Sequence, residues 1–134
     1  AEYMVAADIL LSKAGPGTIM EAAALSLPVL LTSFLPGQEE GNVDFVCCLD
    51  DDNHDAFGAY VNDRDPVGIA EQVVAWLQDD DLLATLSRNA KARGAPYAAR
   101  DIAKAIGDST LKWKEINEEN GKACIADSLA EKKK

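Results

Sequence analysis

The sequence predicts an α/β fold in which parallel strands alternate with helices. Residues 8–12 and 27–32 are short apolar runs, which is typical of strands buried on both faces. The stretch between them, residues 18–26, is rich in alanine and suits a helix. A strand, a helix and a strand at this spacing form a βαβ unit, so the two strands should be parallel neighbours in one Rossmann-like sheet.

The same alternation continues along the chain. We expect a second helix over residues 41–49 and a third strand over residues 56–61. Asp65 and Pro66 predict the start of the next helix, because Asp suits the N-cap and Pro suits the first helical position. The apolar side chains expected on one face of that helix are Ile69, Val73, Trp76 and Leu77.

The C-terminal part of the chain predicts further helices. One restarts at residues 79–81, ends at Gly94 and carries an apolar face, and Pro96 opens another. Beyond Gly107 the apolar pattern weakens, although Trp113 and Ile116 could anchor one last helix. Residues 117–121 have the composition of a turn or a frayed end, and residues 132–134 should be disordered.

Composition limits the function classes. The chain has 134 residues, enough for one domain or part of one, and its 48% hydrophobic content can supply a core. The net charge of −10 and the sequence pI of about 4.4 argue against broad nucleic-acid binding, since phosphates would be repelled. A single anionic ligand stays compatible with this charge, because local backbone N–H groups can hold it.

The cysteines predict neither a disulfide framework nor a zinc site. Cys47, Cys48 and Cys124 are odd in number and lack C-x-x-C spacing, so a reducing compartment fits better. The adjacent Cys47 and Cys48 should be small buried residues of a helix. No apolar run is long enough to span a bilayer and no targeting segment is visible. The chain starts close to a core strand, which predicts a fragment.

A glycine-rich turn, Lys13-Ala-Gly-Pro-Gly-Thr-Ile-Met-Glu21, joins the first strand to the first helix. Glycine permits positive φ and close approach of a ligand, and a helix N-terminus offers free N–H groups, so this turn could hold a diphosphate. Neither the Walker pattern nor G-x-G-x-x-G is present. The alternative is a structural turn, in which Thr18 and Glu21 form a capping box and Lys13 is a surface lysine.

A polar loop, Pro36-Gly-Gln-Glu-Glu-Gly-Asn42, follows the second strand. Because the strands are expected to be parallel, this loop and the glycine turn should lie at the same edge of the sheet. Gln38 and Glu39 offer an amide and a carboxylate, which suit sugar hydroxyls that both donate and accept hydrogen bonds. A solvated polar loop is the alternative.

Together, the two loops and the strand Leu27-Pro-Val-Leu-Leu31 resemble the monogalactosyldiacylglycerol synthases, which are plant and algal plastid enzymes. These enzymes group with the peptidoglycan N-acetylglucosaminyl transferases and the bacterial processive diacylglycerol glucosyltransferases. The resemblance is specific over residues 7–46, looser to about residue 106, and does not cover the tail.

The resemblance implies the C-terminal half of a GT-B fold, which binds a nucleotide-sugar donor, without its first strands. Residues 1–107 would form this UDP-sugar-binding domain, and residues 108–134 a C-terminal helix and disordered tail. By the same resemblance, Gly15, Pro16, Gly17 and Thr18 would face the diphosphate, with Lys13 beside them. Glu21 would hold the ribose, and Gln38 and Glu39 the galactose, on a loop bent by Pro36 with Asn42 at its end.

The implied reaction is inverting transfer of galactose from UDP-galactose to diacylglycerol, with no metal and no cofactor. The general base and the membrane-facing lipid site would belong to the N-terminal half, so this chain alone should bind donor weakly and catalyse nothing. The implied location is the plastid envelope, as a peripheral protein, or otherwise the cytoplasmic face of a membrane.

Three alternatives stay open. The donor could be UDP-glucose, since the C4 epimers differ in one hydroxyl direction that the sequence does not resolve. The acceptor could also be something other than a lipid. The chain could instead be a non-catalytic nucleotide-sugar-binding subunit of a split transferase. The acidic loop at residues 50–55 departs from the plant pattern; with His54 it could hold a metal, but a solvated loop is expected.

Overall fold

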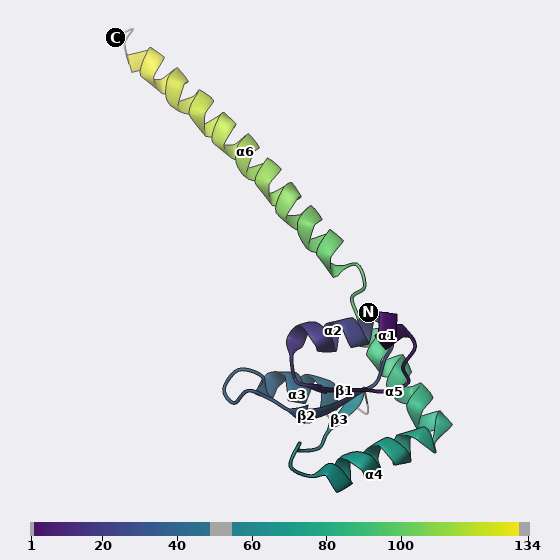
Figure 1. Cartoon of the computed structure of the whole chain (residues 1–134). Coiled ribbons are helices and arrows are strands. Elements are labelled where there is room, and N and C mark those ends of the chain that lie inside the picture. The colour runs from purple at the N-terminus through teal and green to yellow at the C-terminus, as the bar shows by residue number, and fades with distance from the viewer. Residues whose placement is uncertain (1, 49–54, 132–134) are drawn as a thin grey trace. The chain divides into compact units, whose positions relative to one another are not determined.

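The structure is a computed structural model that describes residues 2–48 and 55–131 (Figure 1). The chain divides into two compact units, Ala1–Pro96 and Tyr97–Lys134. The first unit contains all the strands of the described residues and both predicted loops. The acidic loop lies almost wholly outside the described residues, as do residues 132–134, so the expectations for both stay predictions.

The first unit is built on a parallel sheet, as predicted. Its strands are β1 (Leu10–Lys13), β2 (Val29–Ser33) and β3 (Gly58–Tyr60), in the order β1-β2-β3. Both pairings are parallel, with Leu10 opposite Val29 and Val29 opposite Gly58. All three carboxyl ends therefore meet at one edge, which is the edge that binds ligands in α/β proteins.

Helices cover both faces of this sheet (Figure 1). They are α1 (Glu2–Val5), α2 (Pro16–Ala24), α3 (Glu40–Cys47), α4 (Pro66–Leu77) and α5 (Asp80–Arg93). Val29 and Leu31 of β2 pack into a cluster with residues of α2 and α3, whereas Leu30 packs with residues of α4 and α5. This burial on both faces explains why β2 reads as a continuous apolar run rather than an alternating one.

The predicted start of α4 is confirmed. The Asp65 carboxylate accepts a 2.9 Å hydrogen bond from the Gly68 N–H, and Pro66 is the first helical residue. Trp76 is buried, but Leu77 is 53% exposed, so its assignment to the apolar face is wrong. Adjacent helical residues project about 100° apart, and that turn carries Leu77 away from the sheet.

The cysteine prediction is partly wrong. Cys47 is the last residue of α3 and is half-buried, while Cys48 follows the helix in a left-handed conformation with φ of 52°. Burial raises the pKa of the Cys47 thiol to about 11, and Cys48 and Asp44 add to the effect. A thiol that stays protonated at neutral pH is a poor nucleophile, so Cys47 belongs to the packing of the unit and not to its chemistry.

The second unit consists mainly of one long helix, α6 (Ala98–Glu131), which begins two residues after Pro96. The turn expected at residues 117–121 is wrong, because the helix continues through it. Asn and Gly weaken a helix by about 1 kcal/mol or less per residue, whereas only proline, absent from this helix, breaks it outright. The helix also runs through Gly107, where the sequence predicted a domain boundary. None of the helices among the described residues is both long enough and apolar enough to cross a bilayer.

Candidate functional site

The two predicted loops meet at the carboxyl edge of the sheet. The first joins β1 to α2 and the second joins β2 to α3. The Asn42 side-chain amide donates a 2.9 Å hydrogen bond to the Ala14 carbonyl oxygen, and the Lys13 ammonium lies 2.5 Å from the Glu39 carboxylate. The structure thus connects candidate residues that are more than twenty positions apart in the sequence.

The glycine turn presents unpartnered backbone groups. Helix α2 begins at Pro16, and its first N–H to carbonyl bond runs from Ile19 to Gly15 over 3.1 Å. The N–H groups of Gly17 and Thr18 precede that bond, so the helix offers them no acceptor, and no side chain caps this end. Together with the helix dipole, they form a site suited to an anion.

The capping box predicted from Thr18 and Glu21 is wrong. The N-cap is Gly15, because Pro16 with its fixed φ occupies the first helical position and Thr18 is already inside the helix. Glu21 lies in the second turn of α2 with an exposed side chain. The structural alternative for Glu21 therefore falls away, and its carboxylate is accessible to a ligand.

The glycines in the two loops serve different purposes. Gly37 has a φ of 77° and sits at the centre of a turn that Gln38 N–H closes on the Leu35 carbonyl over 3.2 Å, with Pro36 before it. Gly15 and Gly17 do not use the positive φ that glycine permits. At Gly17 a Cβ atom would meet nothing within 4 Å, so open space lies beside the free N–H groups.

Glu39 is the most constrained side chain of the second loop. It is 6% exposed, and its two oxygens accept from the Lys13 ammonium and, over 2.9 Å, from the Leu35 N–H. These two contacts, Lys13 first, hold the pKa of the carboxyl below its usual value despite its burial. Gln38 and Pro36, by contrast, are exposed. The inward position of Glu39 had no signal in the sequence, since both its oxygens bind groups that spacing does not reveal.

The lowered pKa of Glu39 predicts a pH effect on stability. The contribution of its ion pair is complete above the ordinary carboxyl pKa of 4.5 and is lost as the pH falls through the lower folded value. The melting temperature of the wild-type chain should therefore fall more steeply below about pH 4.5 than that of Glu39→Gln. Circular dichroism melts between pH 7 and pH 3 measure this.

Glu40→Gln is the matched control for that experiment. Glu40 follows Glu39 as the first residue of α3 and is exposed, and it has no ion pair among the described contacts. Its variant should follow the wild-type pH profile. Equal flattening in both variants would show that the effect comes from net charge and not from the pair with Lys13.

Two hollows flank the linked loops. One, of about 300 Å³, has a lining of mixed polarity that includes Ser33, Phe34, Pro36, Tyr60, Asn62 and Arg64. The other, of about 320 Å³, is apolar and is lined by Pro16, Ile19, Met20, Gly41, Asn42 and Phe45. The first hollow brings in residues from the end of β3, which sequence reasoning did not include in the site.

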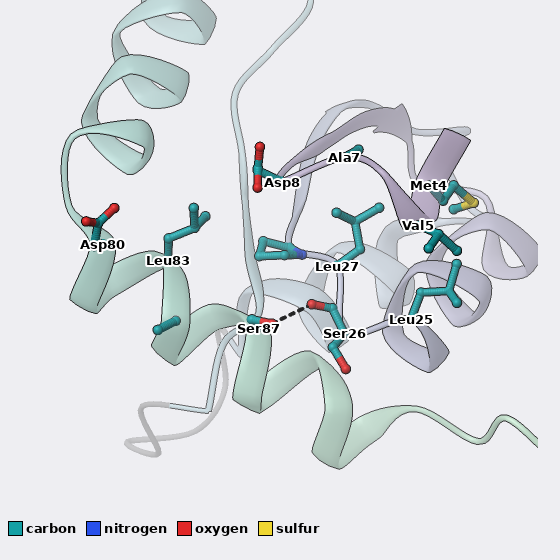
Figure 2. Close-up of a pocket in the computed structure, with 12 residues that line it drawn as sticks. Met4, Val5, Ala7, Asp8, Leu25, Ser26, Leu27, Asp80, Leu83 and Ser87 are labelled. Carbon is teal, nitrogen blue, oxygen red and sulfur yellow. Dashed lines mark hydrogen bonds between the residues drawn. The ribbon is translucent and has the colours of Figure 1, made fainter. Parts of the chain in front are cut away.

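A larger hollow of about 400 Å³ lies away from these loops (Figure 2). It is lined partly by Leu27 and Pro28, which precede β2, and therefore opens at the amino ends of the strands. Figure 2 shows Asp8 and Asp80 at this hollow, and the Ser87 hydroxyl donating to the Ser26 carbonyl oxygen over 2.7 Å. Among the described residues, its lining includes these two carboxylates and no Lys or Arg, whereas the carboxyl edge has the Lys13 ammonium and the free N–H groups of α2, so the carboxyl edge is the better site for a phosphate.

No group of three or more His, Cys, Asp or Glu side chains suited to a metal gathers within residues 2–48 and 55–131. The acidic residues 50–54, with His54, lie outside those ranges. The candidate groups at the carboxyl edge are backbone N–H groups, one ammonium, two amides and two carboxylates. These groups can bind an anion and hydroxyls together.

Residues 1–106 match the glycosyltransferase family 28 C-terminal domain. The chain is 41% identical over 106 residues to monogalactosyldiacylglycerol synthase 3, chloroplastic, of Arabidopsis thaliana, covering 78% of this chain and 21% of the relative. It is 42% identical over 106 residues to the probable monogalactosyldiacylglycerol synthase 2, chloroplastic, of Oryza sativa subsp. indica, with the same coverage. It is 37% identical over 102 residues to monogalactosyldiacylglycerol synthase, chloroplastic, of Spinacia oleracea, covering 75% and 18%.

The chain spans about a fifth of the length of the curated relatives that it matches. The matched region contains both loops and every strand of the described residues, and the resemblance seen in the two loops is confirmed. The chain belongs to glycosyltransferase family 28, whose C-terminal domain it carries as one half of a GT-B fold.

Proposed function

We propose that this chain is the donor-binding part of an inverting galactosyltransferase, which moves galactose from UDP-galactose to diacylglycerol. The observation that carries the proposal is the pair of free N–H groups, Gly17 and Thr18, with open space beside them and a sugar-binding loop tied to the same turn. Membership of family 28 and the names of the relatives support the reaction class and the lipid acceptor.

The diphosphate of the donor binds at the N-terminus of α2, with Lys13 and the turn Gly15-Pro16-Gly17-Thr18 around it. As the glycosidic bond to the sugar breaks, negative charge accumulates on the departing UDP. Fixed N–H groups and a helix dipole stabilise that charge without reorganising, which is how a preorganised site lowers a barrier. The groups proposed to stabilise the departing UDP all belong to this chain.

The rest of the donor lies along the two loops. The exposed carboxylate of Glu21 accepts from the ribose hydroxyls. Gln38 presents an exposed amide to the galactose, and Asn42 and Glu39 hold the loop against the glycine turn. A side-chain amide can donate and accept hydrogen bonds, and so can a hydroxyl. The amide can therefore distinguish sugars that differ in the direction of one hydroxyl.

The general base and the diacylglycerol site come from another part of the protein. The relatives are about five times longer than the matched region, which leaves room for a second Rossmann-like half. The relatives are named as chloroplastic, which supports a plastid location, and we propose the envelope membrane as the place of action. The acidic charge of this chain opposes contact with an anionic bilayer, so docking depends on that other part.

The proposed roles of Glu21 and Gln38 are tested by transfer assays on the intact gene product with UDP-galactose and UDP-glucose. Glu21→Ala should weaken the affinity for both donors about tenfold, through loss of hydrogen bonds to the ribose worth about 1.4 kcal/mol. Its melting temperature should not change, because Glu21 caps nothing. Gln38→Ala should instead reduce the preference between the two donors.

The outcomes separate the alternatives. Higher activity with UDP-glucose in the wild-type protein would identify a glucosyltransferase. Donor binding without transfer to diacylglycerol would favour a non-catalytic subunit. A lower melting temperature and unchanged donor affinity in Glu21→Ala would remove Glu21 from the site.

A further inference from the structure

We propose that Glu39 limits the affinity of the site for diphosphate, because it holds the Lys13 ammonium that a bound diphosphate needs. The inference rests on the proposed function for the identity of the ligand. It assigns Glu39 a positioning role, acting on the donor through Lys13, in addition to any contact with the sugar.

The two members of the ion pair differ sharply in accessibility. The Lys13 side chain is 56% exposed, whereas the Glu39 side chain is 9% exposed. The Lys13 ammonium also lies beside the glycine turn, 3.2 Å from the position that a Cβ atom on Gly15 would take. A ligand at the turn therefore meets the ammonium directly, while the carboxylate stays behind it.

Glu39 is held in place independently of Lys13. Its second oxygen accepts from the Leu35 N–H over 2.9 Å, and the residue is the N-cap of α3. Because the carboxylate is anchored and the lysine is a flexible chain at the end of β1, only the lysine can move when a second anion arrives. The ammonium has three N–H donors, so it can turn from Glu39 towards a phosphate oxygen without leaving the turn.

A neighbouring carboxylate cancels much of the attraction that the ammonium exerts on a third charge. The diphosphate must therefore draw Lys13 away from Glu39 and also approach a fixed negative charge. Both effects weaken the binding of UDP. Weak binding is useful in a transferase, because UDP is the product and must leave before the next donor enters.

The inference is tested by titrating UDP and UMP into the chain, with affinities read from amide chemical shifts. Glu39→Gln should tighten UDP by about tenfold, because the amide still accepts from Leu35 but no longer neutralises Lys13. UMP, with less phosphate charge, should gain clearly less. Glu40→Gln removes the same charge one residue away and should leave both affinities unchanged.

The lysine provides a second measurement of the same pair. Lys13→Met should weaken UDP more than UMP, and the gain from Glu39→Gln should vanish in the double variant. The Lys13→Met measurement stands even if the Glu39→Gln variant does not fold. Unchanged or weaker UDP binding by Glu39→Gln, an equal gain in Glu40→Gln, or a gain that survives in the double variant would each overturn the inference.

A third variant distinguishes this failure from failure of the proposed function. Gly17→Val should abolish UDP binding if the glycine turn is the diphosphate site. If Gly17→Val leaves the affinity for UDP unchanged, or if the wild-type chain does not bind UDP, the proposed function is wrong. If Gly17→Val abolishes binding and Glu39→Gln does not tighten it, the diphosphate site stands and only the role of Glu39 is wrong.

Discussion

Gly17→Val should lower the affinity of the chain for UDP by about a hundredfold while leaving the fold intact. A bulky side chain at this position enters the open space beside the Gly17 and Thr18 N–H groups, where the diphosphate is proposed to bind. Loss of two or more charge-assisted hydrogen bonds, at about 1.5 to 3 kcal/mol each, accounts for an effect of this size. An amide-shift titration with UDP measures it.

The stability of the same variant should change little. No atom lies within 4 Å of a Cβ at Gly17, and valine is slightly more favourable in a helix than glycine, by a few tenths of a kcal/mol. Gly107→Val is the matched control, since Gly107 is also a helical glycine with open space around it and lies in α6. Equal UDP affinity in Gly17→Val and the wild-type chain would exclude the glycine turn as the phosphate site.

Gly58→Ala should destabilise the first unit by about 3 kcal/mol or more. A Cβ atom on Gly58 would overlap the carbonyl oxygen of Val29 and the Cγ1 atom of Val46. The first contact is backbone of the neighbouring strand, which cannot turn aside, so β3 must move away from β2. Urea unfolding followed by tryptophan fluorescence measures the loss, because Trp76 is buried in this unit.

Gly41→Ala is the control for that measurement. Gly41 is in the first turn of α3, where a Cβ atom would meet nothing within 4 Å. Its variant should be neutral or more stable by up to about 1 kcal/mol. A free energy of unfolding for Gly58→Ala within 1 kcal/mol of the wild-type value would contradict the close packing of β3 on β2.

The βαβ unit and the position of the two loops could be predicted because each has a local cause. Apolar runs such as Val29–Leu31 report burial on both faces of a sheet, and an alanine-rich stretch reports a helix. Once the strands are taken as parallel, the loops that follow them must share an edge. These inferences need no knowledge of how individual side chains pack.

The details of the site were harder to predict, because the same side chain can take either of two roles. Thr18 and Glu21 have capping-box spacing, but Pro16 fixes an earlier helix start and leaves that box inside the helix. Glu39 reads as a free sugar ligand, yet it is turned inward by Lys13 and by a backbone N–H of Leu35. Pro16 is local and visible in the sequence, whereas the partners of Glu39 are a backbone N–H and a lysine 26 positions away, which composition and spacing do not reveal.

The hydrogen bond from Asn42 to the Ala14 carbonyl has a consequence for engineering donor choice. It fastens the loop proposed to bind the hexose to the glycine turn, so neither segment can be repositioned by itself. A chimera that imports only residues 36–39 from a relative with a different sugar preference would keep this chain's own Asn42 to Ala14 hydrogen bond. That contact would then hold the imported segment in a position that does not suit it. Grafts that carry residues 13–17 and 36–42 as one block should transplant selectivity, whereas shorter grafts should yield proteins that accept neither hexose well.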